Sequence, residues 1–151
     1  MVHSRFDSPE ASIDYMKRVA VGQSGFSDWL QVEPLIVWEG KSELLLELRA
    51  EMTQHHGFAH GAIVGLMADN ACAWAGASVA GDVVTGGYTI NFLRPAIGKR
   101  LRAKGEVIKP GKRQVIVRSD VWAEGGEKGT LHVATAQATI IPTGLQQAPP
   151  R

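Results

Sequence analysis

The segment HGAIVGLMADNACAWAGASVA, residues 60–80, is the most apolar stretch of the chain and constrains its fold more than any other feature. It contains one carboxylate, Asp69, and one amide, Asn70. Its length matches a membrane-spanning helix, but the central polar pair, the many Gly and Ala residues and the lack of a basic flank after it argue against a span. A helix that is apolar nearly all round in a globular protein is a buried core helix. We therefore expect a central helix over about residues 59–80.

The overall composition is that of an ordinary globular protein. The 151 residues are enough for one domain with a core, which we expect to cover 1–151. The net charge of +1 argues against a nucleic-acid binder, which usually has a strong basic excess. The polar start shows no secretory signal, and the single cysteine, Cys72, cannot form an internal disulfide. We expect a cytoplasmic protein with no membrane or nucleic-acid partner.

Outside the apolar segment the sequence predicts one further helix and several strands. Ser8 can cap an N-terminal helix over about residues 9–21, and Pro9 suits its first turn. Two glycines, Gly22 and Gly25, are expected to end it. One of the strand-like runs also contains good helix formers, so a helix is an alternative for KSELLLELRAEM. The strand-like runs cover residues 32–40, 41–52, 83–95, 100–111, 112–124 and 130–142, and a frayed tail is expected over 143–151.

The last four strand-like runs follow one another at hairpin spacing, which predicts an antiparallel sheet. Such a sheet must cover an apolar element, and the helix over residues 60–80 is the only candidate. The expected fold is therefore α+β, with a curved antiparallel sheet of five to six strands wrapped around one long central helix.

The start of this helix is a candidate binding site. His60 and Gly61 lie where the preceding loop becomes helix, and the first turn of a helix has free N–H groups. A ligand oxygen could approach the Gly61 N–H closely, although Gly61 could equally serve close packing against a strand. Asp69 lies eight residues later, roughly 12 Å along the helix axis, so the two cannot act on one atom within one chain. They could meet if two antiparallel copies of the helix lay across a two-fold axis.

Asp69 itself permits two interpretations. A buried, unpaired carboxylate is costly, so such a group is normally either hydrogen-bonded in the core or functional. The helix also carries a series of small residues that would permit close approach of a strand or a partner helix: Gly61, Gly65, Ala68, Cys72 and Gly76.

The stretch HGAIVGLMADNA, followed by GGYTINFLRPA, resembles the hotdog-fold acyl-CoA thioesterases of the PaaI and human thioesterase superfamily member 2 type. The family motif opens on His-Gly-Gly and ends on Asp. His60-Gly61 and Leu66-Met67-Ala68-Asp69 match it, with Ala62 in place of the second glycine. The resemblance covers about residues 30–142. It implies a hotdog fold and thioester hydrolase activity.

The resemblance also implies roles for individual residues. Asp69 occupies the position of the catalytic carboxylate, which acts as general base on water or as nucleophile on the thioester carbonyl. Gly61 occupies the oxyanion position, and Thr85 a position that supports the acid or the water. Gln54 stands where the family often has Asn, which helps to hold water and carbonyl. In this family the acid and the oxyanion glycine come from different subunits of a homodimer, often within a dimer of dimers, and no cofactor is needed beyond the coenzyme A of the substrate.

The histidines, Cys72 and Trp74 are further candidates. A metal site built from His55, His56 and His60 is disfavoured, because adjacent histidines suit one metal poorly and no partner motif is present. We expect His60 to cap or orient the helix start and His56 to line the pocket. Cys72 is expected to be inert core, and Trp74 either lines an acyl pocket or simply packs.

Basic residues are frequent in the middle strands, where a solvated sheet face explains most of them. Arg94 and Arg113 are our candidates for binding the phosphates of coenzyme A, because Arg pairs well with phosphate. The whole group is Arg94, Lys99, Arg100, Arg102, Lys104, Lys109, Lys112 and Arg113.

Two other functions compete with hydrolysis as interpretations of the sequence. A non-catalytic acyl-CoA-binding hotdog module is the alternative, for which Ala62 and Gln54 leave room. A hotdog dehydratase is disfavoured, because no D-x-N-P-x-H-like signature is present. The sequence does not name the acyl group, since the pocket would be built from two subunits.

Overall fold

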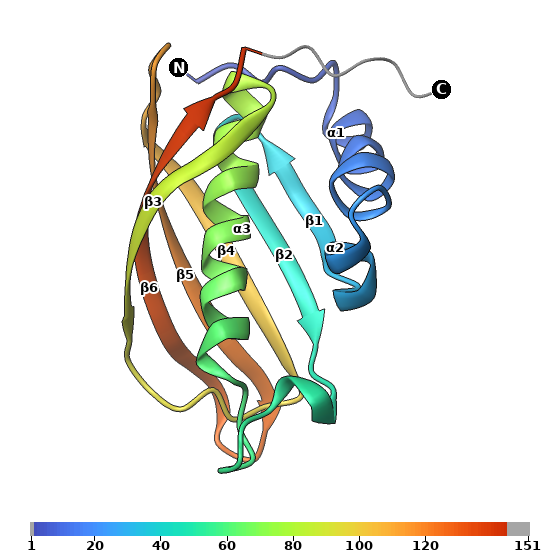
Figure 1. The fold of residues 1–151 in the computed structure, drawn as a ribbon, viewed down its shortest axis with the longest axis vertical. Coiled ribbons are helices and arrows are strands. Elements are labelled where there is room, and N and C mark those ends of the chain that lie inside the picture. The colour runs from blue at the N-terminus through green and yellow to red at the C-terminus, as the bar shows by residue number, and fades with distance from the viewer. Residues whose placement is uncertain (1, 145–151) are drawn as a thin grey trace.

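A computed structural model of the protein describes residues 2–144. Figure 1 shows a curved sheet with one long helix, α3, lying in its concave side and two short helices beside β1. In chain order the elements are α1 (Pro9–Tyr15), a π-helical segment (Met16–Val21), α2 (Gly25–Leu30), β1 (Glu33–Trp38), β2 (Lys41–Glu47), a 3₁₀ turn (Ala50–Met52), α3 (Gly61–Ala80), β3 (Val83–Phe92), β4 (Arg100–Lys109), β5 (Val115–Gly126) and β6 (Gly129–Pro142).

The sheet has six strands in the order β1-β2-β4-β5-β6-β3, and every neighbouring pair is antiparallel. α3 packs against all six strands, and its buried positions form the core together with the inward residues of the sheet. Although α3 is long and apolar enough to span a membrane, more than half of it is buried inside this fold. The predicted α+β architecture, with an antiparallel sheet around the helix of residues 60–80, is therefore confirmed.

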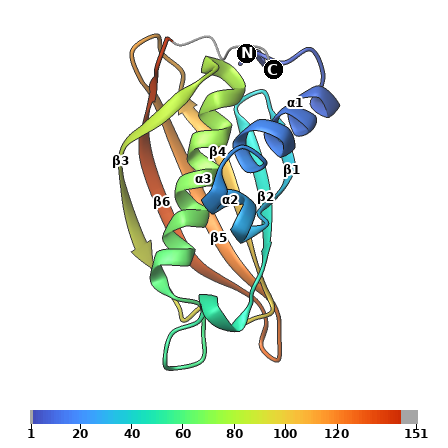
Figure 2. The ribbon, with the colours of Figure 1, turned by 45° about the vertical axis from the view of Figure 1, so that its right-hand side comes forward.

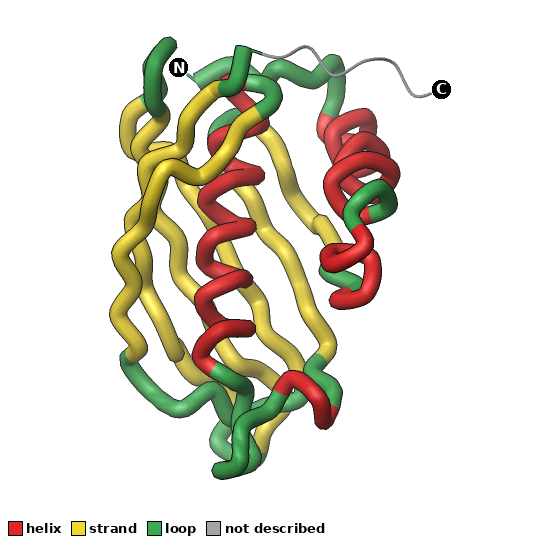
Figure 3. Tube along the Cα trace, viewed as in Figure 1, coloured by secondary structure: helices red, strands yellow, loops and turns green. Residues whose placement is uncertain are grey.

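The expectation that the last four strands form consecutive hairpins is wrong for the first of them. β3 pairs with β6 at the edge of the sheet, whereas β4 lies between β2 and β5. Figure 3 shows the connection from β3 to β4, residues 93–99, running across the end of the sheet. The inward residues of β2 explain this order: Leu44 and Leu46 pair with Ala103 and Leu101 of β4, and all four are fully buried. The edge position leaves one side of β3 without a strand partner among the described residues.

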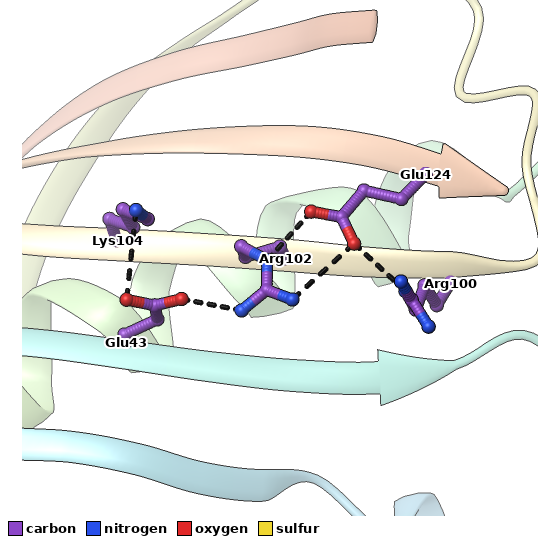
Figure 4. A network of polar contacts seen from close by, with 5 residues as sticks. All are labelled: Glu43, Arg100, Arg102, Lys104 and Glu124. Carbon is purple, nitrogen blue, oxygen red and sulfur yellow. Dashed lines mark hydrogen bonds and ion pairs between the residues drawn. The ribbon is translucent and has the colours of Figure 1, made fainter. Parts of the chain in front are cut away.

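β2 is a strand, and the helix alternative is wrong. The alternation buries Leu44 and Leu46 and places Glu43 on the outer face. There Glu43 pairs with Arg102 and Lys104 of β4 (Figure 4). Burial on one face and cross-strand ion pairs on the other outweigh the favourable helix propensity of Glu and Leu.

The N-terminal helix begins as predicted. Pro9 is its first residue, and the Ser8 hydroxyl accepts a hydrogen bond from the Ala11 N–H at 3.1 Å. The helical run continues to Val21 through one π-helical segment, in agreement with the predicted end. The role predicted for Gly25 is wrong, because this residue starts α2.

α2 was not predicted from the sequence. The Ser24 hydroxyl caps its start by accepting from the Ser27 N–H at 3.2 Å, and Gln31 ends it in the left-handed region. Figure 2 shows α1 and α2 lying together over β1, beside α3.

α3 sits in close contact with the sheet because small residues lie beneath it. Ser42, Gly105 and Ser119 are neighbours on β2, β4 and β5. The Ser42 hydroxyl donates to the Ala71 carbonyl at 2.6 Å, and the Ser119 hydroxyl donates to the Ala68 carbonyl at 2.9 Å. A Cβ atom on Gly105 would lie 2.2 Å from the same Ala71 oxygen. These contacts hold the middle turns of α3 against the sheet.

The ends of two predicted segments differ from expectation. α3 begins at Gly61 rather than near residue 59, because His60 adopts the extended conformation of an N-cap. Of the tail expected to be frayed, residues 145–151 lie outside the described part of the chain. Thr143 is held, because its N–H donates to the Asp82 carbonyl at 3.0 Å.

Candidate active site

Asp69 and Thr85 form the first part of the site. Asp69 lies in the middle of α3 and is half-buried. The Thr85 hydroxyl, on β3, donates to the Asp69 carboxylate at 2.6 Å. The structure thus brings together the two residues that the family resemblance pairs. The hydroxyl orients the carboxylate and leaves its second oxygen for another partner.

A bulge in β3 determines which side chains face α3. Gly86 has no partner in the register between Thr85, which pairs with Ile140, and Gly87, which pairs with Thr139. Side chains alternate between the two faces of a strand, so Thr85 and Tyr88 would lie on opposite faces of a regular one. The extra residue reverses the alternation and puts both on the face toward α3.

The start of α3 forms the second part. The His60 Nδ1 atom accepts from the Ala62 N–H at 3.0 Å, so the predicted capping role agrees with the geometry. The N–H groups of Ile63 and Val64 donate to the His60 carbonyl. Among the residues that the structure describes, none accepts a hydrogen bond from the Gly61 N–H. That donor remains available to a ligand oxygen at the positive end of the helix dipole.

A pocket of about 350 Å³ opens beside Gly61. Gln54 and Arg94 line it together with Gly61, so the structure brings these three predicted residues to one place. Arg94 is exposed and donates to the His132 carbonyl at 3.0 Å. The remaining lining is mostly apolar and comprises Phe58, Ala59, Val64, Phe92, Leu93, Pro95 and Ala96.

Three of the residues predicted for substrate binding, His60, His56 and Arg113, do not line this pocket. His56 is exposed and stacks on Phe58, with ring centroids 5.8 Å apart. The backbone N–H of His56 donates to the Gln54 side-chain oxygen at 3.0 Å, so His56 orients Gln54 rather than lining the cavity. Arg113 lies in the loop between β4 and β5, at a separate surface pocket. Within one chain the structure does not bring Arg113 to the Gly61 pocket.

The two parts of the site are separated along α3. Asp69 is two helical turns from Gly61, roughly 12 Å at the rise of an α-helix. Neither Asp69 nor Thr85 lines the pocket at Gly61. A single chain therefore presents two half-sites at different levels of one helix.

Cys72 and Trp74 belong to the core. Cys72 is fully buried, and burial raises the pKa of its thiol to about 11. A thiol with that pKa stays protonated near neutral pH and is a poor nucleophile, in agreement with the prediction of an inert residue. Trp74 is buried and does not line the Gly61 pocket. Among the described residues, no group of three His, Cys, Asp or Glu side chains could hold a metal ion.

Two aromatic residues that lie near the half-sites were not predicted from the sequence. A Cβ atom added to Gly61 would lie 3.6 Å from the Phe92 ring, so Phe92 packs against Gly61. A Cβ atom added to Gly65 would likewise meet the Tyr88 hydroxyl, so Tyr88 packs against Gly65. Both are substantially exposed on the edge strand. The signal available was the alternation of Tyr88, Ile90 and Phe92, which reads as one face of a strand.

Comparison with known proteins identifies the family. The family model described as thioesterase superfamily matches residues 56–130, which include Gly61, Asp69 and Thr85. The chain belongs to the thioesterase superfamily. No curated protein matches it.

Solved structures of the superfamily have the same fold. A thioesterase family protein from Silicibacter pomeroyi is 29% identical, with a TM-score of 0.77, and the match covers 85% of this chain and 96% of that one. A mutant of the phenylacetic acid degradation protein PaaI from Thermus thermophilus is 27% identical, with a TM-score of 0.68 over 78% and 98% of the two chains. The Escherichia coli PaaI protein, at 22% identity, shares the fold with a TM-score of 0.77 over 91% and 97%. The fold is the hotdog fold, and membership of the superfamily supports thioester hydrolysis as the activity.

Proposed function

We propose that this thioesterase-superfamily chain is an acyl-CoA thioesterase that hydrolyses its substrate to a free acid and coenzyme A. The observation that carries the proposal is that Asp69, hydrogen-bonded by the Thr85 hydroxyl of β3, lies on the same helix that presents the free Gly61 N–H. The proposed reaction uses water and these protein groups and calls for neither a metal nor an organic cofactor. A cytoplasmic location is part of the proposal.

In the proposed reaction, Asp69 acts on water or on the substrate directly. As a general base it takes a proton from water while the water oxygen attacks the thioester carbonyl. As a nucleophile it forms a mixed anhydride, which water then hydrolyses. In both routes the carbonyl oxygen becomes negatively charged, the carbon–sulfur bond breaks, and the coenzyme A thiolate leaves and takes up a proton. The Gly61 N–H stabilises the oxyanion, and Gln54 assists at the same end of the helix.

The separation of the half-sites leads us to propose a homodimer in which Asp69 of one chain meets Gly61 of the other. The free edge of β3 and its exposed apolar residues support this assembly. A strand with one unpaired edge can extend the sheet by pairing with its own copy. The exposed apolar residues at this edge are Val84, Tyr88, Phe92 and Leu93, with exposures of 55%, 43%, 57% and 43%. We propose a dimer of dimers as the full assembly, which sedimentation equilibrium tests.

The first test of the proposal is Asp69→Asn, which keeps the size of the side chain and removes its charge. Loss of a general base or nucleophile is expected to lower kcat by at least ~100-fold across acyl-CoA substrates. The control is Asp120→Asn on the outer face of the sheet, which should keep full activity. If Asp69→Asn turned over like the wild type, the proposed role of Asp69 would be wrong.

The same assay separates the alternative function. Stabilisation of the wild type by acyl-CoA in a thermal shift measurement, without hydrolysis of any substrate, would favour a non-catalytic acyl-CoA-binding module.

Gly61→Pro tests the oxyanion site. Proline suits the first helical position, and His60 already has the extended conformation that a following proline requires, so α3 should form while the N–H is lost. Gly61→Ala keeps the N–H, and its Cβ would make only ordinary contact with Phe92. We expect Gly61→Pro to lower kcat by ~100-fold and Gly61→Ala to have a much smaller effect.

Mixed dimers then test whether the site is shared between chains. When Asp69→Asn and Gly61→Pro chains are coexpressed, each mixed dimer contains one site with both residues intact. Half of the randomly formed dimers are mixed, so about one quarter of the wild-type activity should return. If the mixture stays as inactive as either variant alone, the site lies within one chain.

A further inference from the structure

Tyr88 lies between the two half-sites. Its side chain faces α3, where a Cβ atom on Gly65 would be 3.2 Å from the tyrosine hydroxyl. Its partner across the sheet is Ala138, so small residues surround it on two sides. Gly65 is one helical turn from Gly61 and one turn from Asp69. Along the axis of α3, Tyr88 therefore lies midway between Gly61 and Asp69, the two residues that are proposed to act on the thioester.

The contacts between α3 and β3 follow a regular order. Phe92 lies at Gly61, Tyr88 at Gly65 and Thr85 at Asp69. If a two-fold axis brings Gly61 of one chain to Asp69 of the other, then Gly65 lies beside the axis, because it is halfway between them. Each Tyr88 then lies next to the axis, roughly 6 Å along the helix from each thioester carbonyl.

We propose that Tyr88 closes the inner end of the acyl-binding site and limits the length of the acyl group. This inference rests on the proposed function and on its shared site. The substrates are then thioesters of short-chain acids. Tyr88 is a specificity-determining residue, and it does not take part in the chemistry.

The direction of the acyl group follows from the two ends of the site. The pocket beside Gly61 is open to the surface and is lined by Arg94, which suits the large, anionic coenzyme A portion. The acyl group extends from the other side of the carbonyl carbon, toward the axis and Tyr88. The Tyr88 side chain is 43% exposed in the single chain, and its hydroxyl has no hydrogen-bond partner among the described residues. A rigid aromatic ring at this point ends the cavity sharply.

The test compares Tyr88→Ala, Tyr88→Leu and Tyr88→Phe with the wild type. Thr89→Ala is the matched control, because Thr89 is the next residue on β3 and lies on the opposite face. We measure kcat/KM for straight-chain substrates from acetyl-CoA to palmitoyl-CoA. We also measure, by calorimetry, the binding of S-alkyl-CoA thioethers of the same lengths, which cannot be hydrolysed.

We expect Tyr88→Ala to raise kcat/KM for the longer substrates at least ~10-fold relative to the shorter ones, since each newly buried methylene contributes several-fold. Tyr88→Leu should give an intermediate change, and Tyr88→Phe should keep the wild-type limit. A ratio of long-chain to short-chain activity that is unchanged in both Tyr88→Ala and Tyr88→Leu would overturn the inference.

The thioethers distinguish this failure from failure of the proposed function. If the wild type hydrolyses no acyl-CoA, the proposed function is wrong, and the binding profile still decides the role of Tyr88. Tighter binding of long thioethers by Tyr88→Ala supports the length limit, and an unchanged profile contradicts it.

Discussion

At the scale of single residues, the role that we propose for the Thr85 hydroxyl is to position the Asp69 carboxylate. Thr85→Val keeps the shape of the side chain and removes the donor that holds the carboxylate at 2.6 Å. A hydrogen bond to a charged group stabilises by about 1.5–3 kcal/mol, so we expect kcat to fall by ~10-fold or more with little change in KM. Thr85→Ser should restore most of the activity. Equal activity of the Val and Ser variants would show that the hydrogen bond does not position the carboxylate.

Cys72 gives a prediction about reactivity and pH. Because burial raises the pKa of its thiol to about 11, the folded protein at neutral pH should react with a disulfide reagent only through unfolding. In the unfolded chain the thiol has its ordinary pKa of 9.0. As the pH rises above 9.0, the unfolded state therefore loses protons that the folded state keeps, and the free energy of unfolding decreases.

The measurements for Cys72 are labelling rates with and without urea, and urea unfolding curves across the alkaline range. Cys72→Ala should lack the part of the alkaline destabilisation that the thiol causes. Rapid labelling of the native protein would contradict the buried position.

At the scale of elements, the contact of α3 with the sheet depends on Gly105. Any side chain there would meet the Ala71 carbonyl at 2.2 Å, and a backbone atom cannot move aside alone. We expect Gly105→Ala to reduce the free energy of unfolding by about 1–3 kcal/mol and to lower activity, because Asp69 lies on the displaced part of the helix. Gly25→Ala is the control, since nothing lies within 4 Å of its Cβ position. Urea unfolding monitored by circular dichroism measures both, and equal stability of the two variants would contradict the close contact.

The outer face of the sheet is held by an ion network that crosses three strands. Glu124 of β5 pairs with Arg100 and Arg102 of β4, and Arg102 also pairs with Glu43 of β2 (Figure 4). The Arg102 and Arg100 guanidinium groups hold the pKa of Glu124 below its ordinary value of 4.5. The stabilisation from charged Glu124 is fully present above pH 4.5 and is lost as the pH falls through the lowered pKa of Glu124.

Glu124→Gln should therefore reduce the free energy of unfolding by about 2 kcal/mol at neutral pH, with a smaller difference from wild type near roughly pH 3. Glu51→Gln is the control, because Glu51 is half exposed in its pair with Arg49 and should contribute little. Urea unfolding at the two pH values gives the comparison. A constant difference at both would show that the charge of Glu124 is not responsible.

At the scale of the whole molecule, the proposed assembly makes activity depend on the edge of β3. Val84 is 55% exposed there, outside both half-sites. Val84→Glu should weaken the dimer, so that activity per chain falls at low protein concentration and recovers at high concentration. Ile108→Glu is the control, because Ile108 is similarly exposed on β4. Sedimentation velocity and activity over a dilution series test this, and a Val84→Glu variant that dissociates without losing activity would contradict a shared site.

Much of the fold could be predicted from local patterns. The alternation of Leu44 with Glu43 and the capping by Ser8 both depend on short-range periodicity or side-chain chemistry. α2 was missed because Gly25, usually a helix breaker, is tolerated at a first helical position where Ser24 supplies the cap. The pairing of β3 with β6 could not be read from spacing, because strand order depends on which faces are buried against each other.

The sequence by itself determined the central helix, its single carboxylate and the distance from that carboxylate to the helix start, because these depend only on hydrophobic pattern and helical rise. The tertiary structure decided which groups meet them. A one-residue bulge at Gly86 turns both Thr85 and Tyr88 toward α3, and the loop before α3 brings Gln54 to the Gly61 pocket. Such contacts join residues far apart in the chain, and packing of the whole sheet around one helix is the physical reason that they form.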